Sequence, residues 1–300
     1  MALVELERIS KTYDHKIAVR ELSLRIDAGT MFGLLGPNGA GKTSSIRMMI
    51  GITLPDSGTV RLFGESFNRK FLRRVGYLPE ERGLYGKMKV LEQLTFMGQL
   101  HGLDARTAEQ RAKRWCEQLD LSESLGSKTE ALSKGMQQKV QFIASLLHEP
   151  DLIIMDEPFA GLDPVNSRAL EETLLALRES GKAILFSTHR MDQVEKLCDF
   201  ICLVDHGQAV LTGSMREVKS RFPRDRIALE FEGDGLFLKD PMIEESKSYG
   251  NHVELRLKRG ADPQRLLHLA AESARIFRFE LMEPSLEEIF IRTVGGRTDA

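Results

Sequence analysis

The chain has 300 residues, and its 42 basic and 44 acidic side chains leave a formal net charge of −2. An apolar fraction of 42% supplies a sizeable core and argues against disorder, while the near-neutral charge argues against nucleic acid as an obligatory partner. The sequence contains neither an apolar run of the roughly 20 residues that a membrane span needs nor a secretory signal pattern, so we expect neither a channel nor a secreted protein. Cys116, Cys198 and Cys202 form no CxxC pair, which favours free thiols in a reducing cytosol.

Strand patterns open the chain. Residues 3–26 read as short strands around a polar turn, and residues 31–35 form an apolar run before a glycine-rich loop. Helical spacing follows at Ile46, Met49 and Ile50, and residues 60–63 predict one more short strand.

The pattern changes near residue 80 and becomes mainly helical from residue 88 to 147. One helix face combines five residues at helical spacing: Ala108, Ala112, Trp115, Cys116 and Leu119. Strands and helices then alternate over residues 151–155, 167–180, 183–187, 191–197 and 200–204. This alternation predicts a parallel sheet with crossover helices, an α/β fold.

Residues 222–225 form the best linker candidate, so we expect a first domain over residues 1–222 and a second over residues 223–300. Apolar and polar residues alternate beyond the linker in three segments, and helical spacing occurs in two: 227–231, 253–257 and 277–281, then 263–274 and 285–293. The pattern predicts a small α+β domain.

The strongest chemical signal is an octet that fits GxxxxGK[ST] between a strand and a helix. It comprises Gly36, Pro37, Asn38, Gly39, Ala40, Gly41, Lys42 and Thr43, with Ser44 next in the chain. Glycines let successive backbone N–H groups point at phosphate oxygens, and the helix N-terminus adds positive potential. We therefore expect the phosphates of a nucleotide here, with Lys42 on the β- and γ-phosphates and the Thr43 hydroxyl on Mg²⁺.

Asp156 and Glu157 end the apolar run Leu152–Met155. The carboxyl end of a buried parallel strand is where ligands bind in such sheets. We expect Asp156 to hold Mg²⁺ and Glu157 to act as general base toward water. Taken alone, the pair would be no more than a solvated strand end.

Together these motifs resemble the nucleotide-binding subunit of an ATP-binding cassette (ABC) transporter, over about residues 3–220. Tyr13 resembles the aromatic residue that stacks on adenine, and Glu80 falls where the family has its Q-loop glutamine. Leu132–Met136 resembles the LSGGQ signature, Asp163 the D-loop aspartate and His189 the switch histidine. Each of these residues alone has an ordinary structural explanation, such as a strand-edge aromatic or a helix N-cap, but their order along the chain favours the cassette.

The resemblance implies a P-loop NTPase cassette with a RecA-like core, an antiparallel β subdomain and a helical subdomain over about residues 83–150. It further implies that two cassettes sandwich ATP between the phosphate loop of one and the signature of the other. Residues with an implied role in the partner's site are Ser133, Lys134, Gly135 and Met136. Asp163 is then expected to link the two sites, His189 to hold the γ-phosphate, and Glu80 to ligate Mg²⁺ and relay the nucleotide state.

Two departures from the family pattern stand out: Lys134 and Met136 replace Gly and Gln of the signature, and Glu80 replaces glutamine. The segments 76–85 and 282–290 resemble bacterial ABC-2 exporters, among them sodium-efflux and drug- or antibiotic-efflux ATPases. The resemblance implies a separate polytopic permease, a second cassette, no nucleic acid, and a peripheral position on the cytoplasmic face of the plasma membrane. The alternative is a soluble ABC ATPase that acts on ribosomes or DNA. Such proteins carry two cassettes or a long coiled coil, and this chain shows one phosphate loop and no coiled coil.

Overall fold

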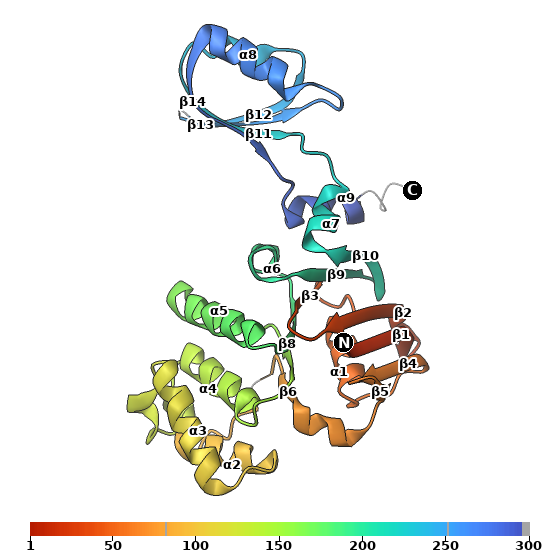
Figure 1. Cartoon of the computed structure of the whole chain (residues 1–300), viewed down its shortest axis with the longest axis vertical. Coiled ribbons are helices and arrows are strands. Elements are labelled where there is room, and N and C mark those ends of the chain that lie inside the picture. Colours follow the sequence, from red (N-terminus) through yellow and green to blue (C-terminus); the bar gives the residue numbers. More distant parts are fainter. Residues whose placement is uncertain (82, 251, 296–300) are drawn as a thin grey trace. The chain divides into compact units, whose positions relative to one another are not determined.

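Figure 1 shows the computed structural model of the chain, in which residues 1–81, 83–250 and 252–295 are described. The chain divides into two compact units, Met1–Met215 and Arg216–Ala300. The boundary between residues 222 and 223 stays a prediction.

The larger unit begins with an antiparallel sheet of four strands in the order β2–β1–β4–β5. Its strands are β1 (Ala2–Tyr13), β2 (Lys16–Asp27), β4 (Ser57–Leu62) and β5 (Glu65–Ser66). Their inward apolar side chains belong to one buried core together with those of the neighbouring sheet, which confirms the predicted strands at the start of the chain.

A second sheet of six strands positions the loop with the GxxxxGK[ST] motif. In sheet order it contains β10 (Gln208–Ser214), β9 (Phe200–Asp205), β3 (Met31–Leu35), β8 (Ala183–Thr188), β7 (Leu152–Asp156) and β6 (Val75–Leu78). All pairings are parallel except that of β10 with β9. The strands β3, β7 and β8 are buried at every residue, which is why they read as continuous apolar runs. The predicted parallel sheet is confirmed.

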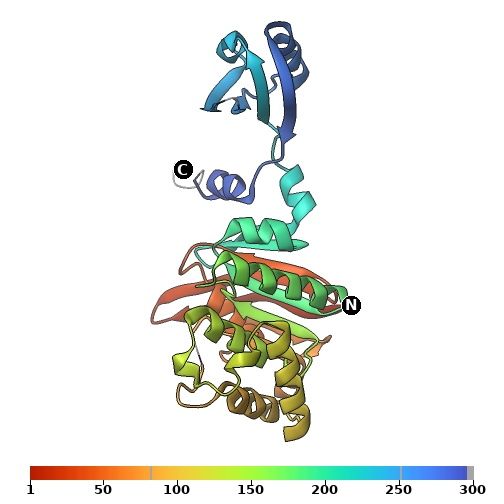
Figure 2. The same cartoon turned by 90° about the vertical axis from the view of Figure 1, so that its left-hand side faces the viewer.

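Helices follow the strands of this sheet, as Figure 2 shows for the elements in yellow and green. They are α1 (Lys42–Met49), α2 (Val90–Leu100), α3 (Ala105–Gln118), α4 (Lys134–Leu146), α5 (Pro164–Glu179) and α6 (Met191–Leu197). Helices α2, α3 and α4 pack on one another and form the helical part that the sequence predicted between residues 88 and 147. In α3 the buried residues are Ala108, Ala112 and Cys116, whereas Trp115 is only half-buried.

A helix boundary and an edge strand differ from the predictions. Helix α5 begins at Pro164 rather than at residue 167, because Asp163 caps its N-terminus and proline suits the first turn. Strand β10 was not predicted, because only partly buried and exposed residues make it up. Within the described residues no helix is long and apolar enough to cross a membrane.

The smaller unit contains an antiparallel sheet in the order β12–β13–β11–β14, with α8 (Pro263–Ser273) packed against it. Its strands are β11 (Arg226–Gly233), β12 (Ile243–Tyr249), β13 (His252–Leu257) and β14 (Ala274–Met282). Helices α7 (Met215–Ser220) and α9 (Leu286–Gly295) lie before and after it in the chain. The three predicted strands and two predicted helices are confirmed, but the prediction missed β12, whose side chains are almost all exposed.

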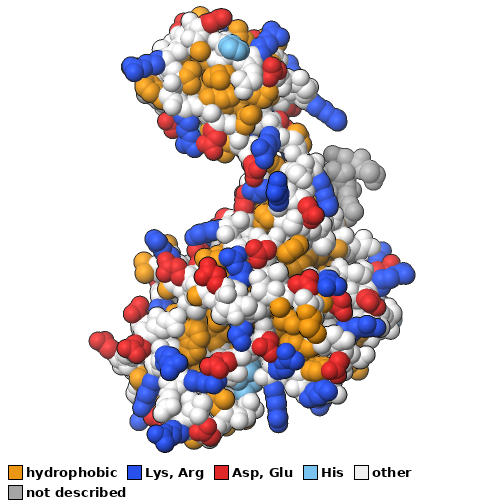
Figure 3. Space-filling model, viewed as in Figure 1, with side chains coloured by type: hydrophobic (Ala, Val, Ile, Leu, Met, Phe, Trp, Pro, Cys, Tyr) orange, Lys and Arg blue, Asp and Glu red, His pale blue; other side chains and the backbone are white. Residues whose placement is uncertain are grey.

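Charged side chains of both signs cover the surface. On the face that Figure 3 shows, Lys and Arg are mixed with Asp and Glu rather than gathered into one large area of a single sign. This mixing agrees with the near-neutral net charge.

Candidate functional site

The loop between β3 and α1 is glycine-rich because its backbone passes close to other strands. A Cβ added at Gly36 would lie 2.1 Å from the carbonyl oxygen of Val204, and one at Gly41 would lie 2.3 Å from that of Ala18. Both glycines also have positive φ, 150° and 106°. The turn at Gly207 backs the loop, since its N–H donates to the carbonyl oxygen of Ala40 at 2.9 Å.

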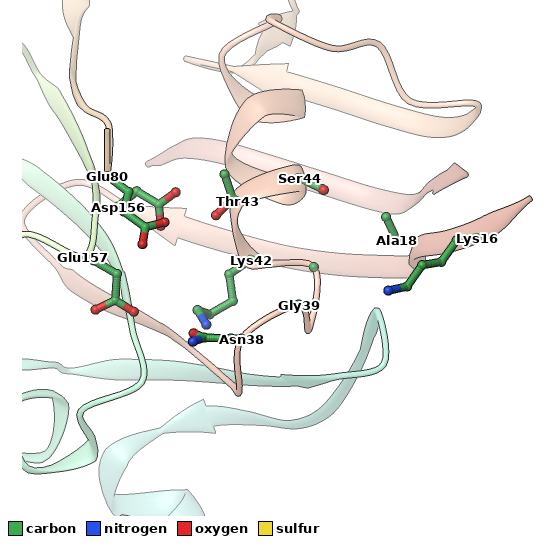
Figure 4. Close-up of a pocket in the computed structure, with 11 residues that line it drawn as sticks. Lys16, Ala18, Asn38, Gly39, Lys42, Thr43, Ser44, Glu80, Asp156 and Glu157 are labelled. Atoms are coloured by element: carbon green, nitrogen blue, oxygen red, sulfur yellow. The ribbon is translucent and has the colours of Figure 1, made fainter. Parts of the chain in front are cut away.

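The loop encloses one side of a cavity of about 310 Å³. The lining residues are Lys16, Ala18, Asn38, Gly39, Gly41, Lys42, Thr43, Ser44, Glu80, Asp156 and Glu157. Figure 4 shows the carboxylates of Glu80, Asp156 and Glu157 on one side of the loop and Lys16 with Ala18 on the other. The cavity therefore combines backbone N–H groups, one buried ammonium and three carboxylates.

Lys42 is the ammonium at the centre of this arrangement, and its side chain is buried. Its Nζ donates to the carbonyl oxygens of Gly36 at 2.7 Å and Pro37 at 3.1 Å. Burial lowers the pKa of Lys42, and the carboxylates of Glu157 and Asp156 oppose that shift. The carbonyl oxygens of its own loop hold the ammonium at a position from which it can move to phosphate oxygens.

Asp156 ends β7 and is almost completely buried, with 1% of its surface exposed. The Ser187 hydroxyl, directly opposite on β8, donates to Oδ1. The other oxygen, Oδ2, is buried and has no hydrogen-bond partner in the described part of the chain. An unpartnered buried carboxylate oxygen is costly unless a cation or ligand meets it, so the residue fits a Mg²⁺ ligand.

No cluster of three His, Cys, Asp or Glu side chains able to hold a metal occurs among residues 1–81, 83–250 and 252–295. A cation here would need the Thr43 hydroxyl, which Figure 4 shows facing Asp156 and Glu80, together with oxygens of phosphate and water. Mg²⁺ commonly binds in that way, through one or two carboxylates plus substrate phosphates.

Glu157 is held tightly in an unusual conformation. Its φ of 49° lies in the left-handed region that side chains other than glycine rarely adopt. The Thr188 hydroxyl donates to Oε2 at 3.0 Å, and the backbone N–H of His189 donates to Oε1 at 3.1 Å. Nδ1 of His189 lies 2.9 Å from the same Oε1. The loop after β8 therefore fixes the carboxylate and places the imidazole beside it.

Glu80 lies in the loop after β6, as the sequence predicted, and lines the cavity. Gln141, on α4, fixes that loop through two hydrogen bonds. Its Nε2 donates to the carbonyl oxygens of Pro79 and Glu81, both at 3.1 Å, so the two neighbours of Glu80 are fixed from the helical part.

The signature residues lie outside this cavity. Ser133 caps the N-terminus of α4, and its Oγ accepts from the N–H of Met136 at 3.2 Å. Lys134 and Gly135 follow in the first turn, and a Cβ at Gly135 would meet only side-chain atoms at 3.6 Å or more. Asp163 caps α5 and likewise does not line the cavity.

Tyr13 is also outside the cavity, with 40% of its surface exposed. It pairs with Lys16 across the β1–β2 turn, and Lys16 and Ala18 reach the cavity instead. Five residues that contribute to the site or support it were not predicted: Lys16, Ala18, Gln141, Ser187 and Thr188. Only the last two had a sequence signal, since they precede His189 at a predicted strand end.

Two family models match the chain. The model described as "ABC transporter" matches residues 19–160, and the one described as "ATP-binding protein DrrA1-3-like, C-terminal domain" matches residues 213–294.

Several curated proteins are similar over nearly the whole chain. The "Uncharacterized ABC transporter ATP-binding protein YhaQ" of Bacillus subtilis is 40% identical over 98% of this chain and 99% of its own length. The "Linearmycin resistance ATP-binding protein LnrL" of the same species is 32% identical, covering 98% of both chains. The "Nod factor export ATP-binding protein I" of Ralstonia nicotianae is 34% identical over 98% of this chain and 94% of its own.

A solved structure described as "Structure of ATP binding subunit of ABC transporter" superposes with a TM-score of 0.68 at 31% identity. It covers 73% of this chain and 93% of that one. The fold match therefore spans a length close to that of the larger unit.

Proposed function

This chain belongs to the ABC transporter ATP-binding proteins, and from that premise we propose that it hydrolyses Mg-ATP to drive export through a separate membrane permease. It is the ATP-binding subunit of a transporter and an ATPase, the activity general to the family. The observation that carries the proposal is the cavity in which the phosphate loop faces Asp156 and Glu157.

ATP would lie with its phosphates along the backbone N–H groups of residues 38–44, at the N-terminus of α1. Lys42 would exchange its two loop carbonyls for β- and γ-phosphate oxygens. Thr43, Asp156 and Glu80 would hold Mg²⁺. When bound, the ion would neutralise part of the phosphate charge. We propose that Tyr13 stacks on the adenine, with Lys16 beside it at the edge of the cavity.

Glu157 would take the proton from the attacking water. Its carboxylate lines the cavity and is held there by the Thr188 hydroxyl and the backbone N–H of His189, with Nδ1 of His189 beside it. His189 would orient that water and contact the γ-phosphate from the position beside Oε1. The bonds to Thr188 and to the His189 backbone hold the carboxylate in place during proton transfer.

The signature would act in a second copy of the chain. Ser133 and Gly135 lie at the N-terminus of α4, which favours phosphate, yet they line no part of their own chain's cavity. We propose that Ser133, Lys134, Gly135 and Met136 meet ATP held by the partner cassette, and that Asp163 links the two sites.

The export direction rests on relatives whose names describe linearmycin resistance and Nod factor export. We propose a peripheral position on the cytoplasmic face of the membrane, on a polytopic permease that contacts the exported substrate. We also propose residues 1–222 as the cassette and residues 223–300 as a separate small domain.

The shared site has a direct test. Mixing Ser133→Arg chains with Lys42→Ala chains leaves one of the two sites in each heterodimer with both halves intact. Each variant alone should be inactive, and the mixture should recover about a quarter of the wild-type ATPase rate under statistical exchange. Full activity of the Ser133→Arg chain alone contradicts a signature that acts on the partner's ATP.

Coupling to transport is tested by reconstituting the chain with the membrane protein that co-purifies with it. ATPase activity in proteoliposomes should rise when a transported compound is supplied, and Glu157→Gln should abolish the rise. A chain that captures ribosomes or DNA in place of a membrane protein contradicts the transport assignment.

A further inference from the structure

The smaller unit contains a cavity of about 630 Å³, larger than the one at the phosphate loop. Most of its lining comes from residues 220–225 after α7, from the end of β13 with the turn that follows it, and from α9. All of these parts belong to one compact unit. We call it the basic cavity, because six cationic side chains line it: Arg221, Arg224, Arg256, Lys258, Arg259 and Arg292.

Positive charge outweighs negative charge in this lining. Asp225 and Glu244 are the two carboxylates among the lining residues, so six cations leave a formal excess of four positive charges. The whole chain has a net charge of −2, which makes this excess a local feature. From outside the cavity, Glu283 forms an ion pair with Arg224. Three of the cations form no ion pair within the described part of the chain: Arg221, Lys258 and Arg259.

Asp225 holds two of the arginines at the wall of the basic cavity. Nη2 of Arg292 donates to both oxygens of Asp225, at 3.2 and 3.1 Å, and Nε of Arg256 lies 3.5 Å from Oδ2. One carboxylate offsets only one of the two guanidinium charges. Nε of Arg256 is buried, and among the described residues it finds no hydrogen-bond acceptor. A buried donor without an acceptor is costly unless a ligand supplies one.

The turn after β13 fixes the position of Lys258 and of the arginine next to it. The N–H of Ala261 donates to the carbonyl oxygen of Lys258 at 3.0 Å, and Gly260 has the positive φ, 84°, that a tight turn requires. The N–H of Leu257 donates to the carbonyl oxygen of Asp225 at 2.7 Å. Backbone hydrogen bonds thus tie the turn to the segment before β11, which also lines the cavity. The cations are therefore arranged before any ligand arrives.

These side chains have the chemistry of a phosphate site. The planar guanidinium group of arginine binds phosphate through two parallel N–H donors, and several cations around one cavity suit an anion of more than one charge. The volume lies in the range of sites for small ligands. We propose that the basic cavity binds an anion with two adjacent phosphate groups, a chemistry that occurs in soluble phosphorylated compounds and in lipid headgroups.

This site differs in its chemistry from the cavity at the phosphate loop. There, three carboxylates lie beside one ammonium, an arrangement that suits a phosphate bound together with Mg²⁺. In the basic cavity the arginines already occupy Asp225, so no free pair of carboxylates offers itself to a metal. The anion should therefore bind without Mg²⁺, and the proposal does not depend on the proposed ATPase function.

Inorganic pyrophosphate in a buffer with EDTA is the probe. Full-length chains that carry Lys42→Ala, which weakens the phosphate loop, should bind it in isothermal titration calorimetry. Adding Lys258→Ala and Arg259→Ala should raise the dissociation constant at least about tenfold, because two charge-assisted contacts are lost. Both side chains are exposed, so their loss leaves the fold intact. Adding Arg265→Ala is the matched control, since this exposed cation of α8 lies outside the cavity and should not change the constant.

Chemical protection locates the site without a variant. Phenylglyoxal modifies accessible arginines, and mass spectrometry of peptides follows each one separately. Pyrophosphate should slow the modification of Arg221 and Arg259 and leave that of Arg265 unchanged.

Vesicles separate the two sources of the phosphates. If the source is a lipid, phosphatidylcholine vesicles that contain cardiolipin, a lipid with two phosphates, should bind the wild type more tightly than Lys258→Ala/Arg259→Ala. If the source is a soluble compound, these vesicles should bind both forms equally while the effect on pyrophosphate persists.

Three results would overturn the proposal: an unchanged dissociation constant in the Lys258→Ala/Arg259→Ala chain, an equal loss in the Arg265→Ala chain, or no protection of Arg221 and Arg259. ATP hydrolysis by Lys258→Ala/Arg259→Ala chains with an intact Lys42 should match that of the wild type. Failure of the basic cavity therefore leaves the proposed ATPase untouched, and the Ser133 and Lys42 mixture tests that function separately.

Discussion

Nδ1 of His189 lies 2.9 Å from Oε1 of Glu157, although 32 residues separate them in the chain. Parallel pairing of β7 with β8 brings them together, because both residues directly follow the ends of neighbouring strands. The imidazole side chain is 59% exposed, whereas the carboxylate is 11% exposed, so the carboxylate is the buried member of the pair and the imidazole the exposed one. Glu157 lines the cavity, so water in the cavity reaches the carboxylate directly, with the imidazole beside it.

Glu157→Gln should stop hydrolysis while ATP binding persists. The amide oxygen still accepts from the His189 N–H, but the amide cannot take a proton, and a general base contributes about 10²- to 10⁴-fold. Single-turnover ATPase assays give the rate, and light scattering with ATP should show a stable dimer. Glu171→Gln, on α5 outside the cavity, is the matched control and should hydrolyse normally. Normal turnover by Glu157→Gln contradicts the role of base.

Glu80→Gln should retain hydrolysis and depend less steeply on free Mg²⁺. The carboxylate adds a negative charge near Asp156 and the phosphates, and Mg²⁺ offsets that charge. Glu80→Ala should lower the rate, because no oxygen replaces the lost ligand. The measurement is ATPase rate against free Mg²⁺ for the three forms. Three identical curves would show that Glu80 only faces solvent.

Gln141→Leu should raise the Mg²⁺ concentration at half-maximal rate and reduce hydrolysis about tenfold, because two hydrogen bonds to the Glu80 loop are lost. Binding of ATP without Mg²⁺ should stay within about threefold of the wild type, since the phosphate loop is untouched. The exposed Gln99→Leu on α2 is the control for the loss of an amide. Unchanged Mg²⁺ dependence of Gln141→Leu would mean that the loop holds its position without this glutamine.

His148 predicts a pH dependence of stability. Its ring stacks on His101 with centroids 3.8 Å apart, and burial lowers the pKa of His148 to about 4. The unfolded chain then binds a proton at a higher pH than the folded chain does, so stability falls as the pH drops from about 6.5 to about 4. The loss should be on the order of 1–2 kcal/mol for this partly exposed ring. Urea unfolding at pH 7 and pH 5 measures it, and His148→Phe should reduce the difference. Equal pH dependence in both proteins contradicts this assignment.

The sequence predicted the elements whose burial is one-sided or complete. Strands β7 and β8 are buried at every residue, so their apolar runs were unambiguous. Strand β12 was missed because six of its seven residues are exposed and leave no alternation to detect. Contacts across the fold could not be predicted for a different reason. The hydrogen bonds from Gln141 to the Glu80 loop join residues about 60 positions apart, and no local sequence pattern indicates them.

The turn at Gly207 extends the constraint on the phosphate loop to a distant stretch of sequence. Its φ is 79°, and a Cβ there would lie 2.8 Å from the carbonyl oxygen of Ala18. The N–H of Gly207 donates to the carbonyl oxygen of Ala40 in the phosphate loop. A larger residue at this position pushes on β2 at Ala18, which lines the cavity, without ever meeting a phosphate. In a selection for nucleotide binding, Gly207 would therefore tolerate as few substitutions as the glycines of the phosphate loop.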